Sequence, residues 1–278
     1  MALTAGLYIV ATPLGNTEDL SPRAMRVLTD ADLVLAEDTR RTGALFARLG
    51  IARRDGLGFM SFHEHNEEQR TPAVVERVRA GERVALVSDA GTPLLSDPGY
   101  RLVRACRAAG ADVHPVPGPS APLAALCACG LPPYPFTFLG FPPRKPGQAE
   151  RFFALHRDTG ATLVFFERKS RLRETLEAAF AALGARELCI ARELTKEFEE
   201  FIPGRLDALD ELDVELRGEF TVVLGPADPD ERSGEAEVRR VLDEEMAVGG
   251  RPKDVSRRVA ARVRGWTPKQ VYAMQNAG

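Results

Sequence analysis

Short apolar runs alternate with longer amphipathic stretches along the first 120 residues of the chain. Five runs have the length and composition of buried strands, and they cover residues 6–12, 32–37, 58–62, 83–88 and 112–116. Four helices are predicted between them. The first begins at Ser21-Pro22 and ends at Ala31, the second ends at Gly50, the third covers residues 72–80, and the fourth runs from Asp97-Pro98 to Ala109. Strands that alternate with helices in this way predict parallel pairing and an α/β sheet.

The second half repeats the pattern with fewer crossovers. Strands are predicted over residues 162–167, 187–192 and 219–225, with helices over 170–183 and 206–217. After an acidic linker, helices are predicted over 236–248 and 253–263, and Thr267-Pro268 opens a last one. We therefore predict two α/β domains, residues 1–120 and 121–228, followed by a basic C-terminal helical region, residues 229–278.

Every predicted strand of the first domain ends in a polar loop. The loops read ATPLGN (11–16), AEDTRRT (36–42), SFHEHNE (61–67), SDAGTP (88–93) and VPGPSAP (116–122). Ligands of parallel sheets bind at the carboxyl ends of the strands, where glycine allows close backbone approach and Ser, Thr and Asp offer hydrogen bonds. Tight turns alone explain any one of these loops, but five on one edge favour a ligand site.

Motifs and charge narrow the ligand. Neither G-x-G-x-x-G after the first strand nor G-x-x-x-x-G-K-[ST] is present, so a standard dinucleotide fold and a P-loop are not supported. The loops hold few basic groups for a polyphosphate, and a ligand with a neutral adenosine and a zwitterionic end fits better. The four cysteines lie in apolar segments and His63-Glu64-His65 has no third ligand nearby, so we expect neither a metal site nor a disulfide framework.

Composition indicates a soluble globular protein. Hydrophobic residues make up 44% and charged residues 28%, and neither an 18-residue apolar run nor a signal peptide is visible, so we expect a cytoplasmic protein. The net charge of -3 is uneven, because residues 251–278 carry seven Lys or Arg and one acid. A basic end on an acidic body favours an anionic partner such as RNA, although a solvated helix face is the alternative.

Seven motifs together resemble one bacterial family. They are ATPLGNTEDLSPRA, AEDTRRT, SFHEHNE, VSDAGTPLLSDPGY, PVPGPSA, ARELTKEFEE and GEFTVVLG, in this order. The chain resembles the ribosomal RNA small subunit methyltransferase I family, a branch of the tetrapyrrole (corrin/porphyrin) methylases. The resemblance implies two α/β domains that form a cofactor cleft, usually in a homodimer. It also implies S-adenosylmethionine-dependent methylation of a ribose 2'-hydroxyl, on a decoding-region cytidine of 16S rRNA that also carries an N4-methyl group.

Motif by motif, the resemblance implies the residues that contact the cofactor. These are Pro13, Gly15, Asp89, Ala90, Gly91, Thr92, Ser120 and Ala121, with Phe166, Glu167, Thr221 and Val222 at the adenine end. One departure stands out, since FFERKSRL places Arg168 and Lys169 where relatives carry small residues and then His-Arg. The extra charge suits either RNA or solvent. The predicted RNA contacts are Arg40, Arg41, Arg192, Arg257, Arg258 and Lys269, because guanidinium and ammonium groups match phosphate oxygens.

Methyl transfer to a hydroxyl requires a group that accepts the proton. The loops offer His63, His65, Glu64, Glu193, Asp38 and Lys196. We assign catalytic roles to Asp38, His65 and Lys196, of which histidine has the ordinary pKa of a base near neutrality. Asp38, flanked by two arginines, also suits an orienting role. Two other functions stay open, a tetrapyrrole methyltransferase and a non-catalytic RNA-binding ribosome-assembly protein.

Overall fold

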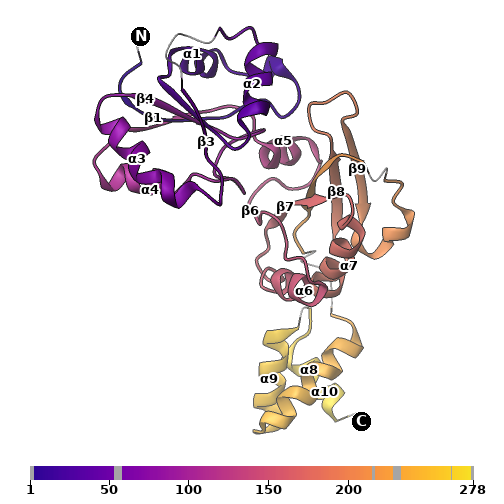
Figure 1. Ribbon diagram of the computed structural model, residues 1–278. Helices are drawn as coiled ribbons and strands as arrows, with labels where there is room; N and C mark the ends of the chain where they lie inside the picture. Colours follow the sequence, from indigo (N-terminus) through magenta and orange to yellow (C-terminus); the bar gives the residue numbers. More distant parts are fainter. Residues whose placement is uncertain (1–2, 53–57, 215–216, 228–232, 264, 277–278) are drawn as a thin grey trace. The chain divides into compact units, whose positions relative to one another are not determined.

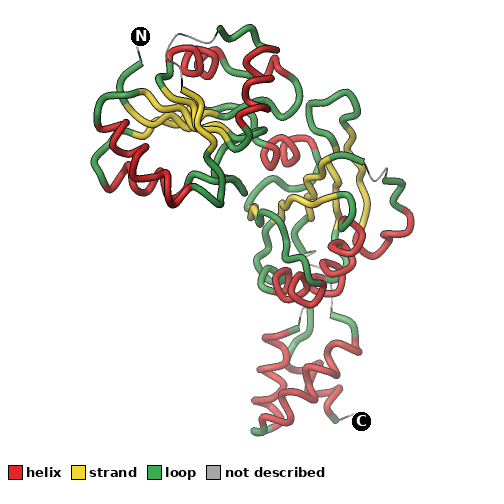
Figure 2. Tube along the Cα trace, viewed as in Figure 1, coloured by secondary structure: helices red, strands yellow, loops and turns green. Residues whose placement is uncertain are grey.

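The computed structural model describes residues 3–52, 58–214, 217–227, 233–263 and 265–276. The chain divides into two compact units, Met1–Pro226 and Ala227–Gly278. The first unit contains two five-stranded sheets (Figures 1 and 2). The predicted division at residue 120 lies inside this unit and remains a proposal, and the predicted α/β fold class is confirmed.

The first sheet is parallel throughout, in the order β3-β2-β4-β1-β5. Its strands are β1 (Gly6–Val10), β2 (Leu33–Ala36), β3 (Gly58–Ser61), β4 (Arg83–Val87) and β5 (Val113–Val116). Apolar clusters cover both faces, one against α1 (Pro22–Asp30) and α2 (Thr39–Arg48), the other against α3 (Glu67–Arg79) and α4 (Tyr100–Ala108) (Figure 1). Because β1 and β4 are neighbours at the centre, the loops that follow them meet at one edge.

Helix starts follow local side-chain chemistry. Ser21 caps α1 through its hydroxyl and Pro22 takes the first turn, as predicted. Two predicted starts are wrong. Helix α3 begins at Glu67, and Pro72 lies inside it, so the proline does not mark the start. Helix α4 begins at Tyr100 after Gly99, whose φ of 126° only glycine adopts readily, and Asp97 therefore lies in the preceding loop.

The second sheet has the order β6-β7-β10-β8-β9, antiparallel except for the β6–β7 pair. Its strands are β6 (Phe136–Phe138), β7 (Thr162–Arg168), β8 (Glu187–Arg192), β9 (Glu200–Arg205) and β10 (Glu219–Leu224). Helices α6 (Pro146–Ala154) and α7 (Leu172–Leu183) cover one face, and α5 (Ala121–Ala128) packs on Val164 and Val223 at the other. Edge strands β6 and β9 and helices α5 and α6 were not predicted.

The helix predicted over residues 206–217 is wrong. Residues Leu206–Glu211 form a 3₁₀ segment, η2, with non-helical backbone at Ala208, and residues 212–214 are irregular. Residues 215 and 216 lie outside the described part. A short 3₁₀ segment η1, Thr17–Asp19, follows the first strand loop.

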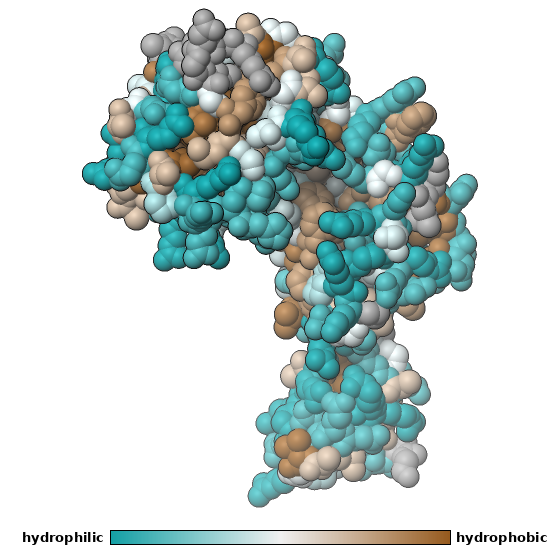
Figure 3. Space-filling model, viewed as in Figure 1, coloured by the Kyte–Doolittle hydropathy of each residue, from teal (hydrophilic) through white to brown (hydrophobic). Residues whose placement is uncertain are grey.

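The second unit consists of helices α8 (Glu235–Val248), α9 (Pro252–Arg262) and α10 (Pro268–Gln275), each within about two residues of its prediction. This unit has a separate apolar core, whose buried residues include Val238, Val241, Val255, Val259 and Val271. On the face seen in Figure 3, hydrophilic residues cover most of this unit. In the described residues, every helix is too short or too polar to cross a bilayer.

Candidate functional site

A cavity of about 700 Å³ lies in the first unit, where loops of the first sheet approach one end of the second sheet. Its size suits a nucleoside-sized ligand. Nine of the twelve predicted cofactor residues line it: Asp89, Ala90, Gly91, Thr92, Ser120, Ala121, Phe166, Glu167 and Thr221. The sequence motifs therefore converge on one space.

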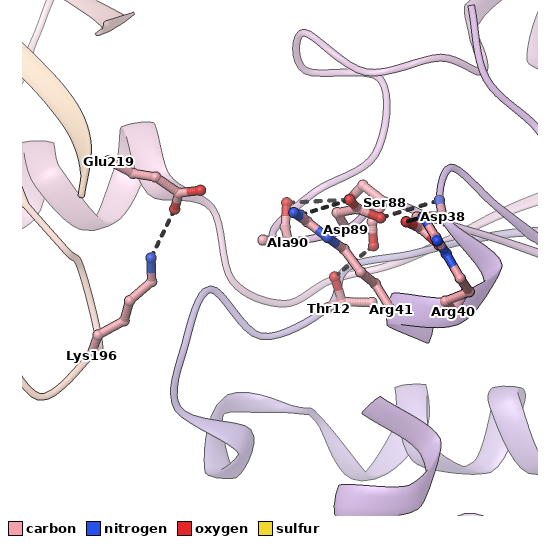
Figure 4. Close-up of polar contacts among 9 residues, drawn as sticks. All are labelled: Thr12, Asp38, Arg40, Arg41, Ser88, Asp89, Ala90, Lys196 and Glu219. Carbon is pink, nitrogen blue, oxygen red and sulfur yellow. Dashed lines mark hydrogen bonds and ion pairs between the residues drawn. The ribbon is translucent and has the colours of Figure 1, made fainter. Parts of the chain in front are cut away.

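Backbone hydrogen bonds lock the loops after β1 and β4 together. The Thr12 amide donates to the Gly91 carbonyl (2.9 Å), and the Gly91 amide donates back to Thr12 (3.0 Å). The buried Thr12 hydroxyl donates to the Ser88 carbonyl (3.2 Å, Figure 4), and the Thr92 hydroxyl donates to the Pro119 carbonyl (2.8 Å) in the loop after β5. We call these three loops the backbone wall.

Gly91 is required by the conformation of this wall. Its φ is 80°, and a Cβ atom there would lie 3.0 Å from the Leu14 Cδ2 atom. Gly15 has a different reason, since its Cβ would lie 2.3 Å from the Lys196 Cγ atom. Gly15 thus leaves room for the side chain of Lys196, which lies in the loop after β8 of the second sheet.

Three predicted cofactor residues do not line the cavity. Pro13 is a buried residue of the first loop, and Gly15 lies beside Lys196. Val222 is fully buried in the apolar cluster that α6 and α7 cover, while its neighbour Thr221 points to the opposite face and lines the cavity. The prediction named Thr221 and Val222 together and so included residues from both faces of β10.

Asp38 and Arg41 hold the loop after β2 against the backbone wall. The Arg41 Nη1 atom donates to Asp89 Oδ2 (2.9 Å), and the Asp38 amide donates to Asp89 Oδ1 (3.3 Å, Figure 4). The Asp38 carboxylate accepts from the Arg40 amide (2.8 Å) and pairs with its guanidinium (3.0 Å). These Arg40 hydrogen bonds lower the pKa of Asp38 to about 2. Neither Asp38 nor Arg40 lines the cavity.

Ion pairs form the opposite side, which we call the charged wall. The Lys196 ammonium donates to Glu193 Oε1 at 2.9 Å. It also donates to Glu219 Oε2 at 2.9 Å (Figure 4). Glu193, with a φ of 49°, also accepts from the Glu219 amide at 3.0 Å. Burial works to lower the pKa of Lys196, but the two carboxylates outweigh it and the pKa is raised. Lys196 lines the cavity as a cation, and its catalytic role stays a prediction.

Glu167 and Phe166 line the cavity beside the charged wall, at the end of β7. Glu167 is 2% exposed, and its carboxylate accepts from the Thr175 hydroxyl (2.6 Å) and the Arg168 amide (2.8 Å). Phe166 packs against Phe138 and Phe141, with ring centroids 5.0 and 5.4 Å away. Glu167 therefore fixes the turn, while Phe166 presents an aromatic surface that suits a flat heterocycle.

Two further predicted residues lie away from the cavity lining. His65 is exposed, and its ring packs edge-on against His63 with centroids 5.9 Å apart. The Arg192 side chain is 8% exposed and pairs with Glu200 at 3.1 Å. A guanidinium so enclosed offers little surface to RNA, so its geometry does not support that assignment.

Asp97 lines the cavity and was missed as a site residue. It follows Leu94 and Ser96, two non-glycine residues with φ of 73° and 69°. Burial, followed by the charge of Glu37, raises the pKa of Asp97 to about 7. The polar end of LVSDAGTPLLSDPG was the available signal, but Asp97-Pro98 also reads as a helix cap.

The sequence matches the family described as Tetrapyrrole (Corrin/Porphyrin) Methylases over residues 6–210. A curated relative from Mesorhizobium japonicum, named ribosomal RNA small subunit methyltransferase I, is 47% identical over 81% of this chain and 77% of its own length. A relative of the same name from Xylella fastidiosa is 41% identical over 98% and 99%.

Solved structures share the fold at low identity. The methyltransferase CobJ has a TM-score of 0.60 at 23% identity, covering 83% of this chain and 97% of that structure. Uroporphyrin-III-C-methyltransferase from Thermus thermophilus has a TM-score of 0.55 at 24% identity, covering 80% and 94%. The two sheets are thus arranged as in tetrapyrrole methylases.

Proposed function

The chain belongs to the tetrapyrrole (corrin/porphyrin) methylase family and, within it, to the ribosomal RNA small subunit methyltransferase I branch; on this premise we propose its reaction. The protein transfers a methyl group from S-adenosylmethionine to the ribose 2'-hydroxyl of a cytidine in the decoding region of 16S rRNA, one that also carries an N4-methyl group. The observation that carries the proposal is the convergence of nine motif residues on one cavity.

The cavity lining suits S-adenosylmethionine. Five carboxylates and three cationic side chains line it, so the net charge favours a sulfonium over a polyphosphate. The aromatic surface at Phe166 suits adenine, and the backbone wall offers carbonyl and hydroxyl groups to the polar end. When bound, the cofactor supplies an already activated methyl group. The protein's task is then to align the acceptor and exclude water.

Basic residues at the cavity support an RNA acceptor. Arg168 and Lys169 line the cavity and are exposed. Arg40, whose side chain is 91% exposed, and Arg41, at 70%, lie beside the backbone wall. The carboxylates of a tetrapyrrole acceptor, the first alternative, would pair with the same cations, so the methyl-transfer assay below decides between the two acceptors.

In the C-terminal unit, Arg257 and Lys269 are the stronger candidates for phosphate contacts. Both are exposed, and Arg257 has only a 3.8 Å pair with Asp254. Arg258 instead donates to the Glu245 carboxylate at 2.6 Å and to the Gly249 carbonyl at 2.9 Å. We therefore assign Arg258 to holding α8 against α9.

We expect the double variant Arg257→Gln/Lys269→Gln to bind 16S rRNA more weakly, with the slope of log affinity against log salt smaller by roughly 1.4. Filter binding at several salt concentrations measures this. Arg258→Gln is the matched control, which should lower the melting temperature instead. An unchanged slope in the double variant would show that Arg257 and Lys269 do not contact RNA phosphates.

The direct test follows labelled methyl from S-adenosylmethionine into small ribosomal subunits and naked 16S rRNA, with digestion to nucleosides. We expect label in 2'-O-methylcytidine. Label in tetrapyrrole substrates only would replace the RNA acceptor. Cofactor binding without transfer to any substrate would favour the non-catalytic assembly protein.

We also propose a homodimer in the cytoplasm, where ribosomal subunits are found. The resemblance to the family supports both. Sedimentation equilibrium of the full chain gives the mass, and the mass of a single chain would refute the dimer.

A further inference from the structure

We propose that the outer face of helix α4 binds a single-stranded segment of the acceptor RNA, with a base on Tyr100 and phosphates on Arg101 and Arg104. The inference rests on the proposed methylation of RNA and deepens it, because it names an RNA contact outside the cavity. Three observations carry it: a hollow in this face of α4, the chemistry of the side chains that line the hollow, and its place beside the cavity.

A hollow of about 630 Å³ lies on the outer face of α4. One side of the helix lines it, with Tyr100, Arg101, Arg104, Ala105 and Ala108. These positions lie about one turn apart, while the fully buried Leu102 and Cys106 hold the opposite side of the helix against the core. Because the two alanines have short side chains, the hollow has room for a ligand between the three long ones.

The three long side chains are one aromatic ring and two guanidinium groups. Tyr100 is 65% exposed. Arg104 is exposed too, and no carboxylate pairs with it among the residues that the structure describes. Arg101 pairs with Glu68 at 2.8 Å, but the two side chains are 61% and 85% exposed, so a phosphate can replace that carboxylate. An exposed ring beside cations is typical of surfaces that bind single-stranded nucleic acids.

A second copy of this chain is the other partner to weigh for an exposed helix face with an aromatic ring. A patch on the two-fold axis of a dimer meets the same patch of its copy. Arg101 and Arg104 of one chain would then lie against the same arginines of the other, and like charges brought together oppose association. RNA phosphates complement these arginines, so charge favours RNA over a second copy.

The hollow lies beside the cavity. Asp97 lines the cavity and Tyr100 lines the hollow, and because they are three residues apart their Cα atoms lie within about 11 Å of each other. The start of α4 is held in place, since one oxygen of the buried Glu67 carboxylate accepts from the amides of Gly99 (3.1 Å) and Arg101 (3.0 Å). An RNA strand that delivers its acceptor ribose to the cavity therefore has a fixed helix face for a flanking nucleotide.

The first experiment tests the aromatic contact by filter binding of 16S rRNA with excess unrelated RNA as competitor. We expect Tyr100→Ala to bind at least roughly fivefold more weakly, because a base loses its stacking surface, and Tyr100→Phe to bind like wild type. Calorimetry with S-adenosylmethionine should find cofactor affinity unchanged, and the melting temperature should stay the same because the ring is mostly exposed. Tyr134→Ala, which removes a ring that is 83% exposed outside the hollow, is the matched control.

The second experiment tests the phosphate contact with Arg104→Gln. We expect weaker binding of 16S rRNA and a slope of log affinity against log salt smaller by roughly 0.7, the change for one phosphate contact on a single strand. Arg151→Gln, an exposed change on α6 outside the hollow, is the matched control with an unchanged slope. In methyl transfer to small ribosomal subunits, Arg104→Gln should raise KM and leave kcat near the wild-type value.

Wild-type RNA affinity in both Tyr100→Ala and Arg104→Gln overturns the proposal. It is also overturned if Tyr100→Ala lowers the mass of the full chain in sedimentation equilibrium, because this face would then join two copies. Failure of the wild-type protein to bind or methylate any RNA would instead contradict the proposed function. The two failures are therefore distinguishable.

Discussion

The two walls of the cavity are built from different interactions. The backbone wall is held by main-chain amides, carbonyls and buried hydroxyls, as in the Thr12–Gly91 pair. The charged wall is held by side chains, and its central pairs join Lys196 to Glu193 and Glu219. The comparison teaches that one cavity combines a side fixed by chain geometry with a side that responds to charge and salt.

The residues of the two walls also differ in their exposure to solvent. Thr12 is fully buried and Ser88 is 4% exposed, so their hydrogen bonds do not compete with water. The side chains of Lys196, Glu193 and Glu219 are 29%, 20% and 79% exposed. Each exposed pair contributes less than about 1 kcal/mol, since water screens it. We therefore expect changes in the backbone wall to have the larger effects.

The largest effect is expected from Gly91→Ala. The added Cβ must adopt a left-handed conformation and approach Leu14, at a cost of about 1–3 kcal/mol. We expect lower stability in urea unfolding and a loss of cofactor affinity of at least roughly tenfold, because the Thr12–Gly91 pair must shift. Gly147→Ala, where a Cβ atom meets open space, is the control. Unchanged affinity in Gly91→Ala would break the contrast.

A smaller effect is expected from Lys196→Met. The change removes both ion pairs while keeping an unbranched side chain, and we expect a loss of roughly 0.5–1 kcal/mol in urea unfolding. The loss should shrink in 1 M salt, where the Debye length is about 3 Å. The methyl-transfer rate of Lys196→Met reports separately on the catalytic assignment of Lys196. A loss in stability of several kcal/mol that does not change with salt would show that the charged wall is no more sensitive to solvent screening than the backbone wall.

The sequence was more informative for one sheet than for the other. Most strands of the first sheet are buried apolar runs with turn residues after them, and all five were predicted. In the second sheet, β6 has three residues and β9 contains Pro203, so neither has the pattern of a central strand. Helix α5 is apolar on all sides and gives no amphipathic signal, and it was missed for that reason.

The residues of the site also differ in how well the sequence predicted them. Residues of short loops, such as Asp89 and Thr92, could be predicted because the loop itself forms the cavity. The roles of charged residues depend on partners distant in sequence. Arg258 meets Glu245, and Asp97 meets no cation among the residues that the structure describes. Neither fact is visible in local spacing. Asp38 and His65 stay predictions whose side chains lie outside the cavity lining.

The Glu67 carboxylate links helix α3 to the start of α4, where it serves the free amides of Gly99 and Arg101. Helix α4 has no side-chain cap of its own, so a residue 32 positions upstream of Gly99 supplies one. In directed evolution of acceptor range, substitutions at Glu67 would disturb the cavity loop from outside the binding surface. A library that varies the lining should therefore hold Glu67 constant.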